Sequence, residues 1–157
     1  MAYSGRPGGL SELARYGFVE LSETLAKLDQ LVSLVGDSGR AALAVLGQSQ
    51  DPDQALNYLL SLAEDQPAAV KKLLKNEESA KRLCLLLGAS SALADFIRRT
   101  PGSLSRFEAA TKLPGDFKSY RDQISKAVVS VDSKEFDRDL LWSTVRRAYR
   151  NELLSLA

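Results

Sequence analysis

The chain has 157 residues, which is the length of one ordinary domain with a single hydrophobic core. Its 21 Lys and Arg nearly balance its 20 Asp and Glu, so no bulk charge draws it to nucleic acid or to an anionic membrane. The hydrophobic share is 45%, and Ala and Leu outnumber aromatic and β-branched residues, which favours packed helices over sheets. We therefore expect a soluble, all-α protein with no nucleic-acid or membrane partner.

Short amphipathic stretches separated by helix breakers fill the first third of the chain. None alternates with the period of two that a half-buried strand requires. Gly17 and Gly36 each offer a left-handed stop, and Ser22 is expected to cap the helix between them. The predicted elements are a flexible tail over residues 1–9 and helices over residues 10–16, 22–35 and 40–46. The expected core stripe of the second helix is Leu25, Leu28, Val32 and Val35.

The clearest helix start is Asp51-Pro52, because Asp accepts hydrogen bonds from free amides and Pro at the first helical position sacrifices none. Its predicted core face is Ala55, Leu56, Leu59, Leu60 and Ala63. Gln66-Pro67 begins a short helix through Val70, Leu73 and Leu74. Two more helices are expected to open at Ser79 and Ser90 and to end at Gly88 and before Thr100-Pro101.

The pattern loosens between residues 102 and 115, where the apolar anchors are Leu104, Phe107 and Leu113. A helix is predicted over residues 120–129, and Ser133 is expected to cap the longest helix, which runs to the end of the chain. That helix has no capping residue at Ala157, which suggests a chain cut within or just after it. Its predicted apolar stripe is Leu141, Trp142, Val145, Ala148, Tyr149, Leu153 and Leu156, with Trp142 and Tyr149 as core anchors. The fold expected is a bundle of about eight to ten mostly short helices, forming one domain over residues 10–157.

No catalytic, cofactor-binding or metal-binding residue is predicted from the sequence. The chain has no histidine, which removes the commonest general base and metal ligand. Cys84 lies in an apolar run and is expected to be a buried hydrophobe that forms no internal disulfide. Together with the lack of a secretory signal, the lone cysteine favours a cytoplasmic location.

Two Asp-x-Asp sequences are candidates for a pair of carboxylates that binds a metal ion. Asp51 is expected to cap a helix, with Asp53 in its first turn, whereas Asp137 and Asp139 are expected early on a helix, where their side chains point about 200° apart. Neither pair is expected to share a metal.

Residues 36–40, GDSGR, lack the Lys-Ser/Thr pair of a phosphate loop and are predicted to be a turn between helices. The arginines Arg146, Arg147 and Arg150 are expected on a solvated helix face, or against a neighbouring domain.

Three stretches carry a family resemblance: residues 51–56 (DPDQAL), residues 87–101 (LGASSALADFIRRTP) and residues 146–154 (RRAYRNELL). Their order and spacing resemble the amino-terminal helical segment of the bacterial glutamine synthetase adenylyltransferases. The most specific match is the Gly-Ala-Ser turn followed by a helix and a closing Arg-x-Pro.

The resemblance implies a parent enzyme with two magnesium-dependent nucleotidyltransferase domains, which transfers AMP from ATP to glutamine synthetase and removes it again. Glutamine and a PII-type signalling protein would regulate that parent. The family's catalytic residues lie beyond this segment, so the chain alone is expected to be inactive and to package the adjoining adenylyl-removing domain. The alternative is a stand-alone helical module that binds a partner protein.

Overall fold

A computed structural model of the chain describes residues 9–100, 102–108, 118, 121–122, 124–126 and 138–156. Its contacts divide the chain into two compact units, Met1–Glu108 and Ala109–Ala157. The described residues form helices and no strands, so the all-α prediction is confirmed. None of the described helices has both the length and the apolar character needed to cross a membrane. The boundaries of the predicted single domain stay a prediction.

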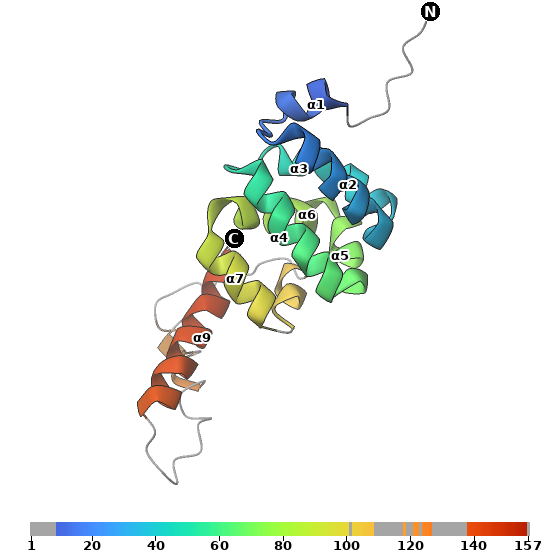
Figure 1. Ribbon diagram of the computed structural model, residues 1–157. Coiled ribbons are helices and arrows are strands. Elements are labelled where there is room, and N and C mark those ends of the chain that lie inside the picture. The colour runs from blue at the N-terminus through green and yellow to red at the C-terminus, as the bar shows by residue number, and fades with distance from the viewer. Residues whose placement is uncertain are drawn as a thin grey trace, which may run out of the picture. The chain divides into compact units, whose positions relative to one another are not determined.

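The first unit consists of short helices packed around a central one (Figure 1). The elements are α1 (Leu10–Arg15), α2 (Leu21–Val35), α3 (Asp37–Leu46), α4 (Pro52–Asp65), α5 (Pro67–Leu74), α6 (Glu77–Ala89), α7 (Ser91–Arg99) and the 3-10 helix η1 (Ser103–Phe107). Helix α4 contacts α2, α3, α5, α6 and α7. Its core face is therefore the middle of the unit.

The sequence pattern explains why α4 takes this place. All five residues of its predicted core face are buried, and Leu62 is buried as well, so apolar side chains cover more than one stripe. A helix that is apolar over a wide arc is stable only when neighbours cover that arc. At roughly 25 cal/mol per Å² of apolar surface, each fully buried leucine contributes about 2 kcal/mol of transfer free energy.

Three predicted helix starts in this unit are wrong. Helix α2 begins at Leu21 after Glu20 and has no side-chain cap, so Ser22 lies within its first turn. Helix α6 begins at Glu77, because Asn76 accepts a hydrogen bond from the Ser79 backbone N–H and so caps the helix earlier than predicted. Helix α3 also begins three residues early, at Asp37.

The glycine stops at Gly17 and Gly36 are confirmed, whereas the one predicted at Gly88 is wrong, because α6 continues to Ala89. Gly17 and Gly36 have φ of +85° and +73°, a region that glycine adopts without the penalty a Cβ imposes. The buried stripe of α2 is rotated slightly from the predicted one and consists of Thr24, Leu28, Leu31 and Val35. Leu104 and Phe107 are buried as expected, whereas Leu113 lies outside the described residues.

In the second unit the described residues include one long helix, α9 (Arg138–Leu156). A long closing helix was predicted, and its predicted cap, Ser133, lies outside the described residues. Of the helix predicted over residues 120–129, residues 121–122 and 124–126 are described and helical, and the others lie outside the described residues. The core-anchor prediction for Trp142 and Tyr149 is wrong, since each is 55% exposed. Among the side chains of α9 that the structure describes, that of Leu154 is buried.

Candidate functional site

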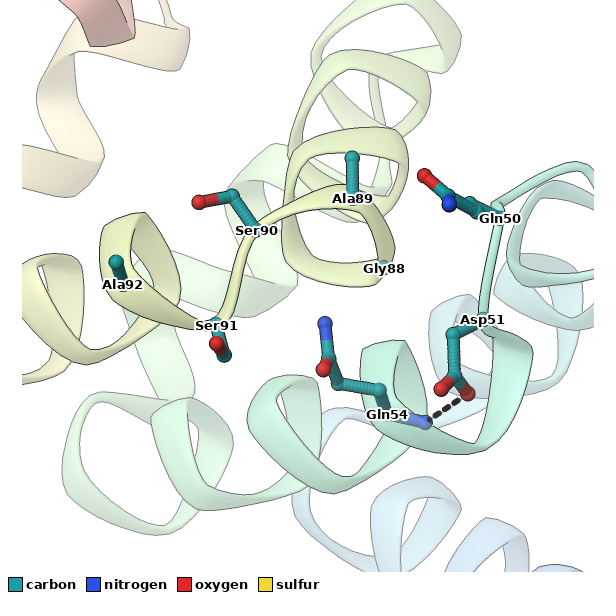
Figure 2. Close-up of a pocket in the computed structure, with 8 residues that line it drawn as sticks. All are labelled: Gln50, Asp51, Gln54, Gly88, Ala89, Ser90, Ser91 and Ala92. Atoms are coloured by element: carbon teal, nitrogen blue, oxygen red, sulfur yellow. Dashed lines mark hydrogen bonds between the residues drawn. The ribbon is translucent and has the colours of Figure 1, made fainter.

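A hollow of about 440 Å³ opens between the start of α4 and the turn from α6 to α7 (Figure 2). It brings together two of the sequence motifs, residues 51–56 and residues 87–101, which are more than 30 positions apart in the chain. Figure 2 shows the two segments facing each other across it. The hollow is lined by Gln50, Asp51, Gln54, Gly88, Ala89, Ser90, Ser91 and Ala92.

Both helices that begin at the hollow are capped by a side chain from the hollow's lining. The Asp51 carboxylate accepts a hydrogen bond of 2.8 Å from the Gln54 backbone N–H, with Pro52 as the first helical residue. The Ser90 hydroxyl accepts one of 3.3 Å from the Leu93 N–H at the start of α7. Each cap satisfies an amide that has no partner within its own helix. Both caps were predicted from the sequence and are confirmed.

A long-range hydrogen bond joins the two sides of the hollow. The Gln54 side-chain amide Nε2 donates to the Leu87 carbonyl oxygen at 2.8 Å. Leu87 lies in the last turn of α6, where carbonyl groups lack helical partners. The Gln54 side chain at the start of α4 thus supplies a hydrogen-bond donor to a carbonyl group at the end of α6.

Gly88 makes the closest backbone approach of this joint. A Cβ placed on Gly88 would stand 2.6 Å from the Ser49 Cβ and 2.9 Å from the Asp51 carbonyl oxygen. Real Cβ atoms do not come so near, so α6 can pack against the segment before α4 only with glycine here. The sequence pattern predicted a helix end at Gly88 but not this contact.

The second carboxylate of the Asp51-Pro52-Asp53 sequence holds a different part of the chain. Asp53 accepts a hydrogen bond of 2.8 Å from the Val19 N–H and another of 2.9 Å from the Thr24 hydroxyl. Both bonds tie the start of α2 to the first turn of α4. Asp53 is 29 to 34 residues away in the sequence, yet it holds the segment where α2 begins. This explains why α2 has no side-chain cap of its own.

Two acidic residues near this corner, Glu20 and Glu23, affect each other's pKa. A hydrogen bond to Glu23 raises the pKa of Glu20, and the repulsion between the two carboxylates adds to this effect. The hydrogen bond from Lys27 lowers the pKa of Glu23, as does the ion pair between these two residues one helical turn apart. Both glutamates are exposed, so their effect is local.

Cys84 is buried in α6, as predicted. Burial raises the pKa of its thiol to about 12, because the thiolate would lose its hydration in the apolar core. A thiol with this pKa is almost entirely protonated at neutral pH and is a poor nucleophile.

Of the other candidate residues that the structure describes, none lines the hollow. Asp139 is in the first turn of α9, and Asp137 lies outside the described residues. The predicted turn over residues 36–40 is wrong, because only Gly36 lies between α2 and α3 and residues 37–40 are the first turn of α3. Within the described part of the chain, no group of three or more Cys, Asp or Glu side chains is placed to hold a metal ion.

The geometry of the hollow is suited to structural support. The side chains of Asp51 and Ser90 cap helices, and that of Gln54 bridges two of them. The one carboxylate of the lining, that of Asp51, already accepts a hydrogen bond from an amide. An anion at the start of α7 would face the negative charge of Asp51, which opposes the attraction of the helix dipole. The described residues around the hollow thus form an all-helical unit in which short helices are joined through caps and a close glycine contact.

Comparison with known proteins finds three similar enzymes. The chain is 34% identical over 150 aligned residues to the bifunctional glutamine synthetase adenylyltransferase/adenylyl-removing enzyme of Leifsonia xyli, and the match covers 94% of the chain. Enzymes with the same name from Streptomyces coelicolor and Streptomyces avermitilis are 35% and 34% identical over 97% of the chain. The chain spans only 15% of the length of each relative.

No protein-family model matches the chain, and no solved structure matches it. The three relatives confirm the resemblance that the motifs indicated. The chain is similar, over nearly its whole length, to one segment of the bifunctional glutamine synthetase adenylyltransferase/adenylyl-removing enzymes.

Proposed function

We propose that the chain is the amino-terminal helical accessory segment of an enzyme that adenylylates and deadenylylates glutamine synthetase. The observation that carries this proposal is the match of 94–97% of the chain to 15% of each of three such enzymes. Alignment across both halves of the chain is expected of a shared structural segment. A short motif common to unrelated proteins would align over far less.

The physical role proposed is to support the adjoining adenylyl-removing domain. The hydrogen bonds of Gln54 and Asp53 support this role, because each joins helices that are distant in sequence and so stiffens the first unit. ATP and Mg²⁺ would be bound by the rest of the enzyme. Glutamine synthetase and a PII-type protein would be partners of the whole enzyme, in the cytoplasm.

A chimera tests the proposal. The segment of the Streptomyces coelicolor enzyme that matches this chain is replaced by the chain, and AMP transfer to and removal from glutamine synthetase are measured. We expect the chimera to keep both activities, and the same enzyme with the segment deleted to lose solubility or AMP removal. The chain alone should have no turnover.

A matched control tests whether the packing of the segment matters or only the presence of its residues. A second chimera carries the substitution Gly88→Val, which should disrupt the joint between α6 and the start of α4. If this chimera and the unsubstituted one have equal activity and thermal stability, or if deletion of the segment has no effect, the support role is wrong. Turnover by the isolated chain would also contradict the proposal.

A further inference from the structure

Helix α9 presents a stripe in which cationic and aromatic side chains alternate. Arg138, Trp142, Arg146 and Tyr149 are spaced by four, four and three residues, which places them on one face of the helix. All four are exposed, and Trp142 and Tyr149 are each 55% exposed. We call these four residues the α9 stripe. Trp, Tyr and Arg dominate the binding free energy of many protein interfaces, so this face has the chemistry of a contact surface.

The order of its residues makes the α9 stripe complementary to itself. From the start of the helix it runs cation, ring, cation, ring, so a second copy lying antiparallel sets a ring against every cation. Arg138 then faces Tyr149 of the second copy, and Trp142 faces Arg146 of the second copy. A guanidinium group stacks favourably on the face of either ring. A contact with two-fold symmetry forms each of these pairs twice.

Both kinds of pair need the same register. The midpoint between Arg138 and Tyr149 lies half-way between residues 143 and 144, and the midpoint between Trp142 and Arg146 is residue 144. At a rise of about 1.5 Å per residue, the two midpoints are under about 1 Å apart along the helix axis. A single two-fold axis therefore brings both pairs into contact at once.

An ion pair fits this register as well. Asp139 and Arg150 are exposed and lie within about 40° of Arg146 around the helix, at one edge of the α9 stripe. Their midpoint lies half-way between residues 144 and 145, so the Asp139 carboxylate of one copy meets the Arg150 guanidinium of the other. Charge complementarity along this edge thus supports the same antiparallel arrangement.

We propose that the α9 stripe is a self-association surface, on which a second copy of the chain packs its own α9 antiparallel. A parallel pair would set each residue against its own copy, and arginine would face arginine. Antiparallel packing also places opposite ends of the two helix dipoles side by side. This inference goes beyond the proposed function and does not depend on it.

Sedimentation of the full chain measures the association. One helix from each copy forms a small interface, so we expect a monomer–dimer equilibrium at roughly micromolar to millimolar concentrations. The matched variants are Arg146→Ala, in the α9 stripe, and Arg147→Ala, at an exposed position about 100° farther around the helix. Arg146→Ala removes two contacts from a symmetric pair and should weaken the dimer about fivefold or more. Arg147→Ala should weaken it less than about twofold.

An exchange of ring and cation tests the pairing itself. Trp142→Arg alone sets arginine against Arg146 of the second copy and should abolish the dimer over the same concentrations. Combined with Arg146→Trp, it restores a ring opposite a cation, so the double variant should dimerise within about fivefold of the native chain. Circular dichroism checks that each variant keeps its helices. A double variant as weak as Trp142→Arg would contradict the pairing.

Cross-linking tests the direction of the two helices. Asp139→Cys and Arg150→Cys are made in separate chains of different mass, mixed, and treated with a short bismaleimide. Cys84 is buried, so the introduced thiol is the one that reacts. In the antiparallel register the linker should join position 139 of one chain to position 150 of the other, whereas two copies of position 139 are about 15 Å apart along the axis. Linkage of like positions would mean a parallel pair.

The single tryptophan reports what covers the α9 stripe. Its fluorescence should change as the concentration of the chain is raised, in step with sedimentation. A chain that stays monomeric at millimolar concentration, equal effects of Arg146→Ala and Arg147→Ala, or a parallel linkage overturns the inference. So does a fluorescence change caused by phosphatidylglycerol vesicles, a DNA duplex or the segment-deleted Streptomyces coelicolor enzyme without one caused by the chain itself. Each of these results leaves the chimera test of the proposed function unaffected.

Discussion

Gly88 lies so close to Ser49 that a Cβ added to the glycine would stand 2.6 Å from the Ser49 Cβ. Ser49 has little room to move, because it is buried and its hydroxyl donates to the Leu46 carbonyl oxygen. The last turn of α6 and the segment before α4 are thus in contact at a point where only glycine fits. This contact positions the residues that line the hollow.

We expect Gly88→Ala to destabilise the protein by about 1–3 kcal/mol, because the added methyl overpacks the joint. In an exposed helix the same change would stabilise by up to about 1 kcal/mol, so the sign of the effect is informative. Urea unfolding followed by circular dichroism measures it. Gly9→Ala is the control, since nothing lies within 4 Å of a Cβ there. A stabilising Gly88→Ala would show that the contact is loose.

The hydrogen bonds of Asp53 predict a loss of stability when the carboxylate is removed. Asp53→Ala leaves the buried Thr24 hydroxyl and the Val19 N–H without their acceptor, at a cost of roughly 1–3 kcal/mol. Asp53→Asn should cost less, because its one carbonyl oxygen can serve one of the two donors. Asp65→Ala, an exposed change at the other end of α4, is the control and should alter stability by under about half a kcal/mol.

A double-mutant cycle tests whether Asp53 acts through Thr24. If their hydrogen bond matters, Thr24→Val should cost much less in the Asp53→Ala background than in the native protein. Strictly additive effects would mean that the two side chains contribute independently.

The raised pKa of Cys84 predicts a pH dependence of stability. The unfolded thiol ionises near its ordinary pKa of 9.0, whereas the folded thiol keeps its proton to about pH 12. The unfolded state therefore loses its proton first, and stability falls as pH rises above 9. Between pH 8 and 10 the native protein should lose about 1 kcal/mol more than Cys84→Ala does.

Urea unfolding of both proteins at the two pH values measures this difference, and Cys84→Ala cancels the contribution of Lys and Tyr titration. In native buffer at pH 8, Cys84 should also react with a thiol reagent far more slowly than in urea. Equal pH slopes for the two proteins would place the thiol in a hydrated site.

The exposure of Trp142 predicts that its removal hardly changes stability. Trp142→Ala should alter the free energy of unfolding by under about half a kcal/mol. Phe107→Ala is the contrasting aromatic deletion, since that ring is buried in the first unit and its loss should cost about 3–5 kcal/mol. A loss above about 3 kcal/mol at Trp142 would instead mean that the ring belongs to a core.

The sequence predicted those features that depend on neighbouring residues. The Asp51 and Ser90 caps and the glycine stops at Gly17 and Gly36 involve groups within about four residues, so their signals are complete in a short window. The buried face of α4 follows equally from its own periodicity. The motifs that carried the family resemblance are local in the same sense.

Tertiary structure decided what depends on residues far apart in the chain. Ser22 has the chemistry of a cap, yet α2 begins where Asp53 binds Val19 and Thr24, a partnership across about 30 positions that no short window contains. The bond from Gln54 to Leu87 and the approach of Gly88 to Ser49 arise in the same way. Trp142 was predicted to be buried because it lies on an apolar helix stripe, yet it is exposed. Such a stripe indicates which face of a helix can be covered, but not which part of the protein covers it. Local hydrogen bonding and periodicity are written in the sequence, whereas the choice of long-range partner depends on how all the helices pack together.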